Sequence, residues 1–269
     1  MDMNKAIFMI LILLGFMSSF AIAGPYAPAA GQAGSTAIYK DDSAFVAWAS
    51  GCDVVRGLMD ISDPSKGYAS YGSADKALGK AVGDSYDVVS LGDGGYATLT
   101  FNAPIYDGPG WDFAVFENGF SDTYLELAFV EVSSDGVNFF RFDSVSLTQT
   151  NTQVGGFASL DTTNIHNLAG KYRQGYGTPF DLSELDGIAG LDINNVTHIR
   201  IVDVVGCIQD AYCTYDSLGH KINDPWPTPF SSGGFDLDAV GVIHQIPEPS
   251  ACLIFIFVAI LGVREKSHN

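Results

Sequence analysis

The chain has 269 residues, of which 47% are hydrophobic, so it is long enough to close a globular core, and its composition excludes disorder and collagen. Its 31 acidic residues oppose 13 basic ones, which gives a formal net charge of −18 at pH 7. Such a surface repels a phosphate backbone, so we expect no nucleic-acid partner. The surplus of carboxylates favours cations, above all Ca²⁺, or neutral ligands such as sugars.

The first 23 residues have the three parts of a secretory signal peptide. Lys5 supplies a positive charge, residues 7–17 form an apolar run, and Ala21-Ile22-Ala23 reads as an A-x-A cleavage site. This run is too short for a retained membrane helix, which needs roughly 20 apolar residues. We therefore expect export of the chain and cleavage after Ala23.

Two short helices are predicted next. Asp41 and Asp42 can cap a helix over residues 44–49, which Gly51 would end, and a second helix is expected over residues 73–78. The strands are predicted from short β-branched or aromatic runs between Gly, Asp, Asn and Pro residues, a pattern typical of a β-sandwich or barrel. The predicted strands cover residues 96–101, 111–116, 125–133, 138–142, 199–205 and 237–243.

Two segments of this region have a more specific pattern. Ala97, Leu99 and Phe101 alternate with polar or mixed positions and should share one buried face of a strand. Residues 129–140 predict a β-hairpin, in which a Ser-Ser-Asp-Gly turn takes a positive φ at Gly136. The polar segment 148–195 is too long for a structureless loop in a compact domain, so it is either functional decoration or contains unrecognised short strands.

Cysteine positions fit an exported protein. Cys207 and Cys213 lie in an Asp-rich segment, and an oxidising compartment favours a disulfide between them. Two free thiols are the alternative. Cys52 stands alone, and Cys252 lies in the C-terminal apolar run. Because no C-x-x-C pair or nearby histidine accompanies them, zinc is not expected.

The last 24 residues, 246–269, contain Pro247-Glu248-Pro249, an apolar run over residues 251–263 and the basic residues Arg264 and Lys266. A short membrane anchor is one interpretation. The order of these features resembles the PEP-CTERM sorting signal of Gram-negative bacteria. The resemblance implies an exosortase-type processing protease as partner, transient membrane association through a C-terminal helix, and delivery to the cell envelope, cell surface or extracellular matrix. Both terminal segments are charge-balanced, so the net charge of −18 belongs to residues 24–245.

Residues 24–245 show no internal repeat and are expected to form one all-β domain. The predicted hairpin, together with residues 91–95 and 112–118, resembles discoidin-type, galactose-binding-like jelly rolls. Over residues 67–243 the chain is similar to secreted PEP-CTERM proteins. The resemblance implies a jelly-roll β-sandwich between signal and sorting helices, in a fold whose members bind sugars, proteins or lipids. Function therefore has to be argued from individual sites.

Acidic side chains gather at three places: around a Gly-Pro-Gly turn, at the end of the strand that follows it, and on one face of the last strand. Calcium takes roughly six to eight oxygen ligands, which such loops can supply. Asx turns at strand ends are the alternative explanation. The predicted calcium ligands are Asp107, Asp112, Glu117, Asn118, Asp236 and Asp238.

Aromatic side chains in polar, Gly-rich and Pro-rich loops are candidates for stacking on a sugar ring. The predicted ligand-binding residues are Tyr172, Tyr176 and Trp226. Alternatively, Trp226 closes the end of the sandwich as a buried plug.

Motifs for catalysis are missing from the sequence: neither G-x-S-x-G nor H-E-x-x-H occurs. We therefore expect a noncatalytic cell-surface or matrix protein that binds an exopolysaccharide, a matrix glycan or other matrix components, with Ca²⁺ holding its loops. A secreted hydrolase acting on polysaccharide is an alternative, since Glu117, Glu126, Glu131 or Glu184 could pair as its two carboxylates. A purely structural matrix component is another.

Overall fold

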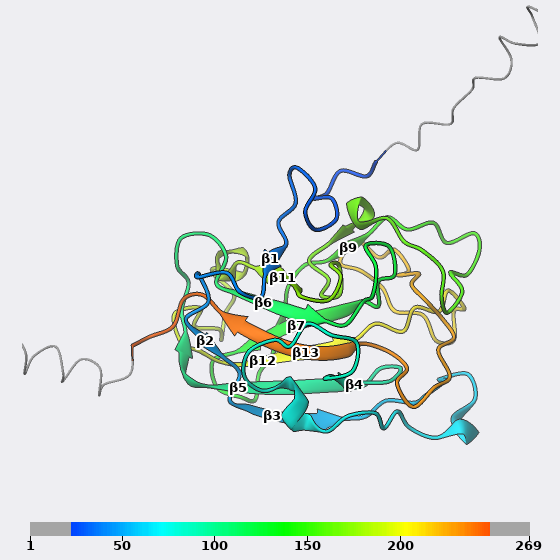
Figure 1. The fold of residues 1–269 in the computed structure, drawn as a ribbon, viewed down its shortest axis with the longest axis horizontal. Coiled ribbons are helices and arrows are strands. Elements are labelled where there is room, and N and C mark those ends of the chain that lie inside the picture. The colour runs from blue at the N-terminus through cyan, green and yellow to red at the C-terminus, as the bar shows by residue number, and fades with distance from the viewer. Residues whose placement is uncertain (1–22, 248–269) are drawn as a thin grey trace, which may run out of the picture.

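The computed structural model describes residues 23–247, and this part of the chain is built from antiparallel strands with no α-helix (Figure 1). Nearly all of the predicted signal segment 1–23 and sorting segment 246–269 lies outside the described residues, as does Cys252. Within the described range, no helix has the length and hydrophobicity needed to cross a bilayer.

The strands form two main sheets. One contains β1 (Ile38–Tyr39), β11 (Tyr176–Phe180), β6 (Phe113–Glu117), β13 (Asp236–Val242) and β2 (Ala47–Trp48) in that order, with β4 (Val89–Ser90) also paired to β13. The other contains β3 (Gly51–Val55), β5 (Tyr96–Ile105), β12 (Val196–Asp203), β7 (Ala128–Ser133) and β8 (Phe140–Arg141). The remaining elements are the pair β9 (Val145–Ser146) and β10 (Ile165–His166), and the 3-10 turns η1 (Pro64–Lys66), η2 (Ala74–Ala77), η3 (Thr162–Asn164) and η4 (Leu182–Leu185).

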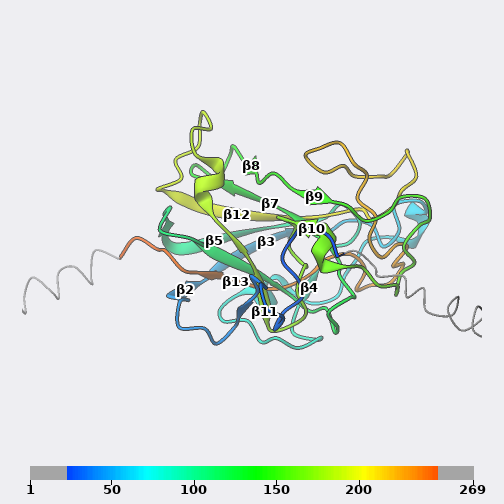
Figure 2. The ribbon, with the colours of Figure 1, turned by 90° about the horizontal axis from the view of Figure 1, so that it is seen from above.

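The two sheets lie in two layers and share one hydrophobic core (Figure 2). Phe113 and Val115 of β6 belong to the same buried cluster as Leu99 of β5 and Ile199 of β12. Phe113 stacks on Phe180 with ring centroids 5.4 Å apart. This arrangement confirms the prediction of an all-β fold and is sandwich-like.

The two most specific strand patterns are confirmed. Ala97 and Leu99 are fully buried on one face of β5. Phe101, predicted on the same face, is half-buried against the core, and Ala103 and Ile105 beyond it are buried. The hairpin joins β7 to β8, and Gly136 in its turn has a φ of 74°, which favours glycine.

The predicted helix over residues 44–49 is wrong. Ala47 and Trp48 instead form β2, whose backbone pairs with β13. The Trp48 ring packs against Phe116 with centroids 5.5 Å apart, so tertiary pairing and packing override local helix propensity here. The second predicted helix is the 3-10 turn η2, and segment 148–195 does contain short strands, β10 and β11.

Candidate functional site

A pocket of about 310 Å³ opens where β6 ends and β13 begins. Loops that are distant in sequence converge there, because the antiparallel pairing of β6 with β13 sets Glu117 opposite Leu237. Aromatic, hydroxyl, amide and acidic side chains are all present at its surface. Its lining residues are Ser85, Asn118, Phe120, Tyr124, Glu126, Phe157, Thr228, Phe230, Ser232 and Asp236.

Four aromatic side chains, Phe120, Tyr124, Phe157 and Phe230, form a continuous wall of this pocket, called the aromatic row below. Phe120 stacks on Tyr124 with centroids 4.5 Å apart, Tyr124 on Phe157 at 6.2 Å, and Phe157 meets Phe230 at 6.0 Å. The three phenylalanines are exposed, and Phe157 leaves 73% of its surface to solvent. Exposed phenylalanines gathered in one patch are unusual on a monomer and mark a binding surface.

Two carboxyl groups line the pocket, those of Glu126 and Asp236. The buried Glu117 precedes the lining residue Asn118 in the chain, and the three carboxyls are called the acidic floor below. Asp236 accepts hydrogen bonds from Ser90 Oγ and, at 3.0 Å, from Asn118 Nδ2. Glu117, only 1% exposed, accepts through Oε2 from the Gly119 amide at 2.7 Å. Its Oε1 is buried and has no hydrogen-bond partner among the described residues.

Burial raises the pKa of each of these carboxyls. The pKa of Asp236 is raised to about 6, because desolvation outweighs its hydrogen bonds. The pKa values of Glu117 and Glu126 lie well above the ordinary value, first through burial and then through the negative charge of Asp236. Burial therefore favours the protonated form of these carboxyls, and a nearby positive charge on a ligand would favour their ionised form.

The loops that carry the aromatic row are fixed by polar contacts below them. Asn223 Oδ1 accepts from the Val154 amide at 2.9 Å, which ties the loop containing Phe157 to the segment before β13. A Cβ on Gly156 would lie 2.5 Å from the Pro227 carbonyl oxygen, so these two loops approach closely only because residue 156 is glycine.

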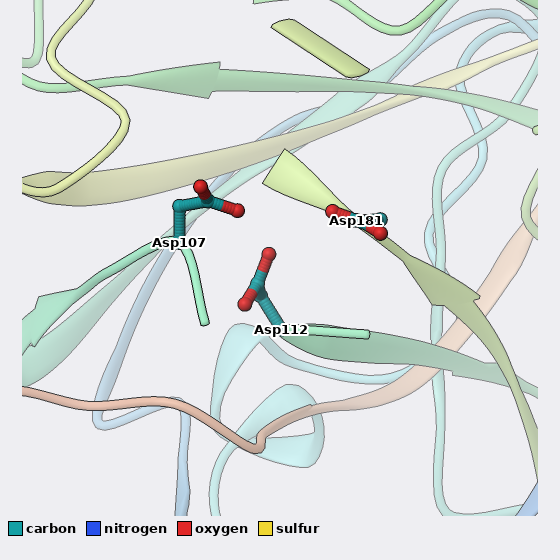
Figure 3. Close-up of side chains that lie close together, drawn as sticks. All are labelled: Asp107, Asp112 and Asp181. Carbon is teal, nitrogen blue, oxygen red and sulfur yellow. The ribbon is translucent and has the colours of Figure 1, made fainter. Parts of the chain in front are cut away.

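A second acidic group, the three-aspartate cluster of Asp107, Asp112 and Asp181, lies at the opposite end of β6 (Figure 3). Their carboxylates face one another from the end of β5, the start of β6 and the end of β11. Within residues 23–247, this is the one group of three acidic, histidine or cysteine side chains whose ligand atoms all lie within 4.8 Å of one another.

Much of the oxygen capacity of this cluster is used by the fold. The fully buried Asp112 accepts from the Gly108 amide at 2.8 Å, from His244 Nδ1 at 2.7 Å and from the Leu182 amide at 2.6 Å. Asp181 caps η4 through the Ser183 amide. Burial raises the pKa of Asp112, although these hydrogen bonds oppose the shift. Asp107 Oδ1 is buried without a partner in the described chain, so it is the oxygen most available to a cation.

The structure divides the six predicted calcium ligands among three surroundings. Asp107 and Asp112 belong to the three-aspartate cluster, whereas Asn118 and Asp236 line the pocket at the other end of β6 and Glu117 is buried next to Asn118. The sixth residue, Asp238, accepts from the Val82 and Gly83 amides at 3.0 and 2.8 Å and so anchors that loop to β13. The six residues therefore do not form a single site.

Two of the three predicted ligand-binding aromatics are buried. Tyr172 is 1% exposed and its hydroxyl contacts Thr36 Oγ1 at 2.8 Å, so its ring offers no face to a ligand. Trp226 is 6% exposed and donates from Nε1 to Asp93 Oδ2 at 3.1 Å, which matches the plug interpretation. Tyr176 is half-buried in β11, with the Arg173 guanidinium 4.7 Å from its ring centroid.

The cysteines of the described chain are free thiols. Cys207 Sγ accepts from the Gln209 amide at 3.4 Å, whereas Cys213 Sγ lies 3.8 Å from the Asp210 carbonyl oxygen. The disulfide between Cys207 and Cys213 is thus absent here, in agreement with the free-thiol alternative, and its formation after export stays a prediction.

Sequence reasoning overlooked the aromatic row, because it searched loops for tyrosine and tryptophan but not for phenylalanine. The signal was present: Phe120 follows a glycine, Phe157 follows two, and Phe230 follows Thr-Pro. A large apolar side chain in such a segment has no strand or helix face along which it can be buried, so the sequence predicts that these phenylalanine side chains are exposed.

Comparisons with known proteins returned no match to a family model, a curated protein or a solved structure. The function therefore has to be inferred from the two sites described above.

Proposed function

We propose that this chain is an exported, noncatalytic cell-surface or matrix protein whose β domain binds a saccharide in the aromatic-walled pocket. The observation that carries this proposal is the exposed aromatic row above a floor of hydrogen-bond acceptors. Ring faces of this kind pack against the C–H surface of a sugar, while Asn118, Thr228, Ser232 and the carboxylates can bind hydroxyl groups.

The terminal segments support an extracellular location. In this proposal the N-terminal signal directs export, and an exosortase-type protease processes the PEP-CTERM-like segment after transient membrane association. The resemblance to discoidin-type jelly rolls agrees with a noncatalytic binding role at the surface of a Gram-negative cell. The partner is then an exopolysaccharide or another matrix glycan.

The test is saccharide binding by the full chain with and without the aromatic row. Phe157→Ala and Phe230→Ala should each weaken binding by at least about tenfold, because each removes a stacking face worth on the order of 1.5 kcal/mol. A glycan array followed by titration calorimetry measures this loss. Tyr68→Ala, which removes an exposed ring outside the pocket, is the matched control and should leave affinity unchanged. Retention of no glycan at all, or equal binding by all variants, contradicts the proposal.

We extend the proposal to Ca²⁺ at the three-aspartate cluster, where Asp107 supplies an unpartnered buried oxygen. Millimolar Ca²⁺ should then raise the free energy of unfolding by up to about 2.7 kcal/mol at a hundredfold excess over the dissociation constant. Thermal unfolding with Ca²⁺ and with chelator measures the difference. Asp107→Asn should abolish it, and Asp186→Asn, an exposed control outside the cluster, should not. An identical response of Asp107→Asn and the unaltered chain would place the cation elsewhere.

A polysaccharide hydrolase is the second candidate, favoured by two pocket carboxyls with raised pKa values, Glu126 and Asp236. Release of reducing ends from a bound polysaccharide, lost in Glu126→Gln, distinguishes the hydrolase from a binding protein.

A further inference from the structure

The acidic floor of the pocket is short of hydrogen-bond donors. Glu126 is 6% exposed and lines the pocket, where its carboxyl has a hydrogen-bonding contact with the Tyr124 hydroxyl. Glu117 beneath it has one oxygen buried without a partner. A carboxyl group accepts more than one hydrogen bond, so Glu126 can take a further donor beside Tyr124. Because Glu126 lies at the pocket surface, a ligand can supply that donor.

No protein cation neutralises this floor within the described chain. None of the pocket's lining residues is lysine, arginine or histidine. Arg56 approaches Asp236 closely enough to lower its pKa, but its guanidinium donates to the backbone carbonyls of Tyr71, Gly72 and Ser90. Burial and mutual repulsion therefore favour the protonated forms of Glu117, Glu126 and Asp236, and no ion pair within the described chain opposes this.

The geometry favours an organic cation over a metal ion. The ligand atoms of the three floor carboxylates do not all lie within 4.8 Å of one another, whereas a calcium ion needs oxygens that converge at 2.3–2.6 Å. An ammonium group on a larger ligand needs only one or two acceptors. The remaining pocket surface is aromatic, and such faces attract both a cation and the C–H surface of the ring that carries it.

We propose that the saccharide bound in this pocket carries a free amino group, which donates hydrogen bonds to Glu126 while the sugar ring stacks on the aromatic row. This inference rests on the proposed function and specifies its ligand class as amino sugars, including partly de-N-acetylated hexosamine polymers. The positive charge of the ligand favours the ionised carboxylate, so the cost of burying that charge is offset when the pocket fills.

A matched pair of probes tests the inference: a glucosamine hexamer and an N-acetylglucosamine hexamer, which differ in free amino groups. Titration calorimetry with the full chain should show the glucosamine hexamer binding at least about tenfold more tightly, the size of effect typical of a charge-assisted hydrogen bond. Glu126→Gln should abolish this preference. Glutamine replaces the buried carboxyl with an uncharged group of similar size, so the substitution should not unfold the chain. Asp186→Asn, an exposed control outside the pocket, should keep the preference.

Each remaining outcome has a distinct meaning. If both hexamers bind equally, or if a neutral glycan from the array is the one ligand bound, the amino-sugar inference is overturned while saccharide binding stands. If no glycan binds, the proposed function fails with it. If a lysine-rich peptide binds as tightly as the glucosamine hexamer, and Glu126→Gln weakens that binding, the ligand is a protein amine and the saccharide is overturned. Phe157→Ala provides a second variant, and it should weaken binding of the glucosamine hexamer by at least about tenfold.

Discussion

Lowering the pH from 7 to 5 is expected to raise the free energy of unfolding by about 3 kcal/mol or more. The cause is a set of buried carboxyls whose pKa is higher in the folded chain than in the unfolded one. Asp236 and Asp238 have pKa values of about 6 against an ordinary value of 3.8. Linkage gives each of them about 1.3 kcal/mol over this interval. Glu117, Glu126, Asp203 and Asp224 have pKa values raised well above the ordinary value by burial and contribute in the same direction.

The sign follows from proton binding. A raised pKa means that the folded state holds protons that the unfolded state has released, so this stabilisation is complete below about pH 4 and is lost as the pH rises through about 6. Exposed carboxyls behave oppositely. Asp135, for example, has its pKa lowered by the backbone amides of its turn and favours folding only while it is ionised. The two opposing sets place maximum stability near pH 4–5.

Urea unfolding at several pH values measures this dependence. Asp238→Asn should reduce the gain between pH 7 and pH 5 by about 1 kcal/mol, since it removes one of the titrating groups. Asp186→Asn, which removes an exposed charge, should leave the gain unchanged. A free energy of unfolding that stays flat or increases from pH 5 to pH 7 would contradict the burial of these carboxyls.

Phe113→Ala is expected to destabilise the domain by about 3–5 kcal/mol, the usual range for removing a fully buried phenylalanine. Phe113 lies on the central strand β6 and packs on Phe142 and Phe180 between the two sheets. Its loss opens a cavity that the surrounding strands cannot close without breaking their register.

The control is the same substitution on the surface. Phe157→Ala removes an exposed ring and should change the free energy of unfolding by no more than about 0.5 kcal/mol, although we expect it to impair binding. Chemical unfolding of both variants provides the comparison. A loss below about 1 kcal/mol for Phe113→Ala would show that the two sheets do not share one core.

Strand patterns predicted much of this fold because burial on one face leaves a direct trace in the sequence. The alternation over Ala97 and Leu99 and the turn at Gly136 both depend on neighbouring residues alone, and both are confirmed. The failure at Ala47–Trp48 has the opposite origin. Local propensity favours a helix there, but β13, almost 200 residues later, supplies the pairing that makes this segment a strand.

The candidate site was harder to predict because it depends on long-range pairing. Asn118 and Asp236 are both predicted as calcium ligands, but they line one pocket only because β6 pairs with β13. Glu126 is predicted within the strand over residues 125–133 and as one of four candidate carboxylates of a hydrolase, and no local pattern shows that it lines this pocket. Burial of Tyr172 and Trp226 likewise depends on packing against distant segments.

A crystal structure of the full chain with the saccharide selected by the array tests the central claim most directly. We expect a sugar ring packed against Phe157 and Phe230, with a polar substituent of the sugar hydrogen-bonded to Glu126. A saccharide bound elsewhere on the surface, with the aromatic row uncovered, would contradict it.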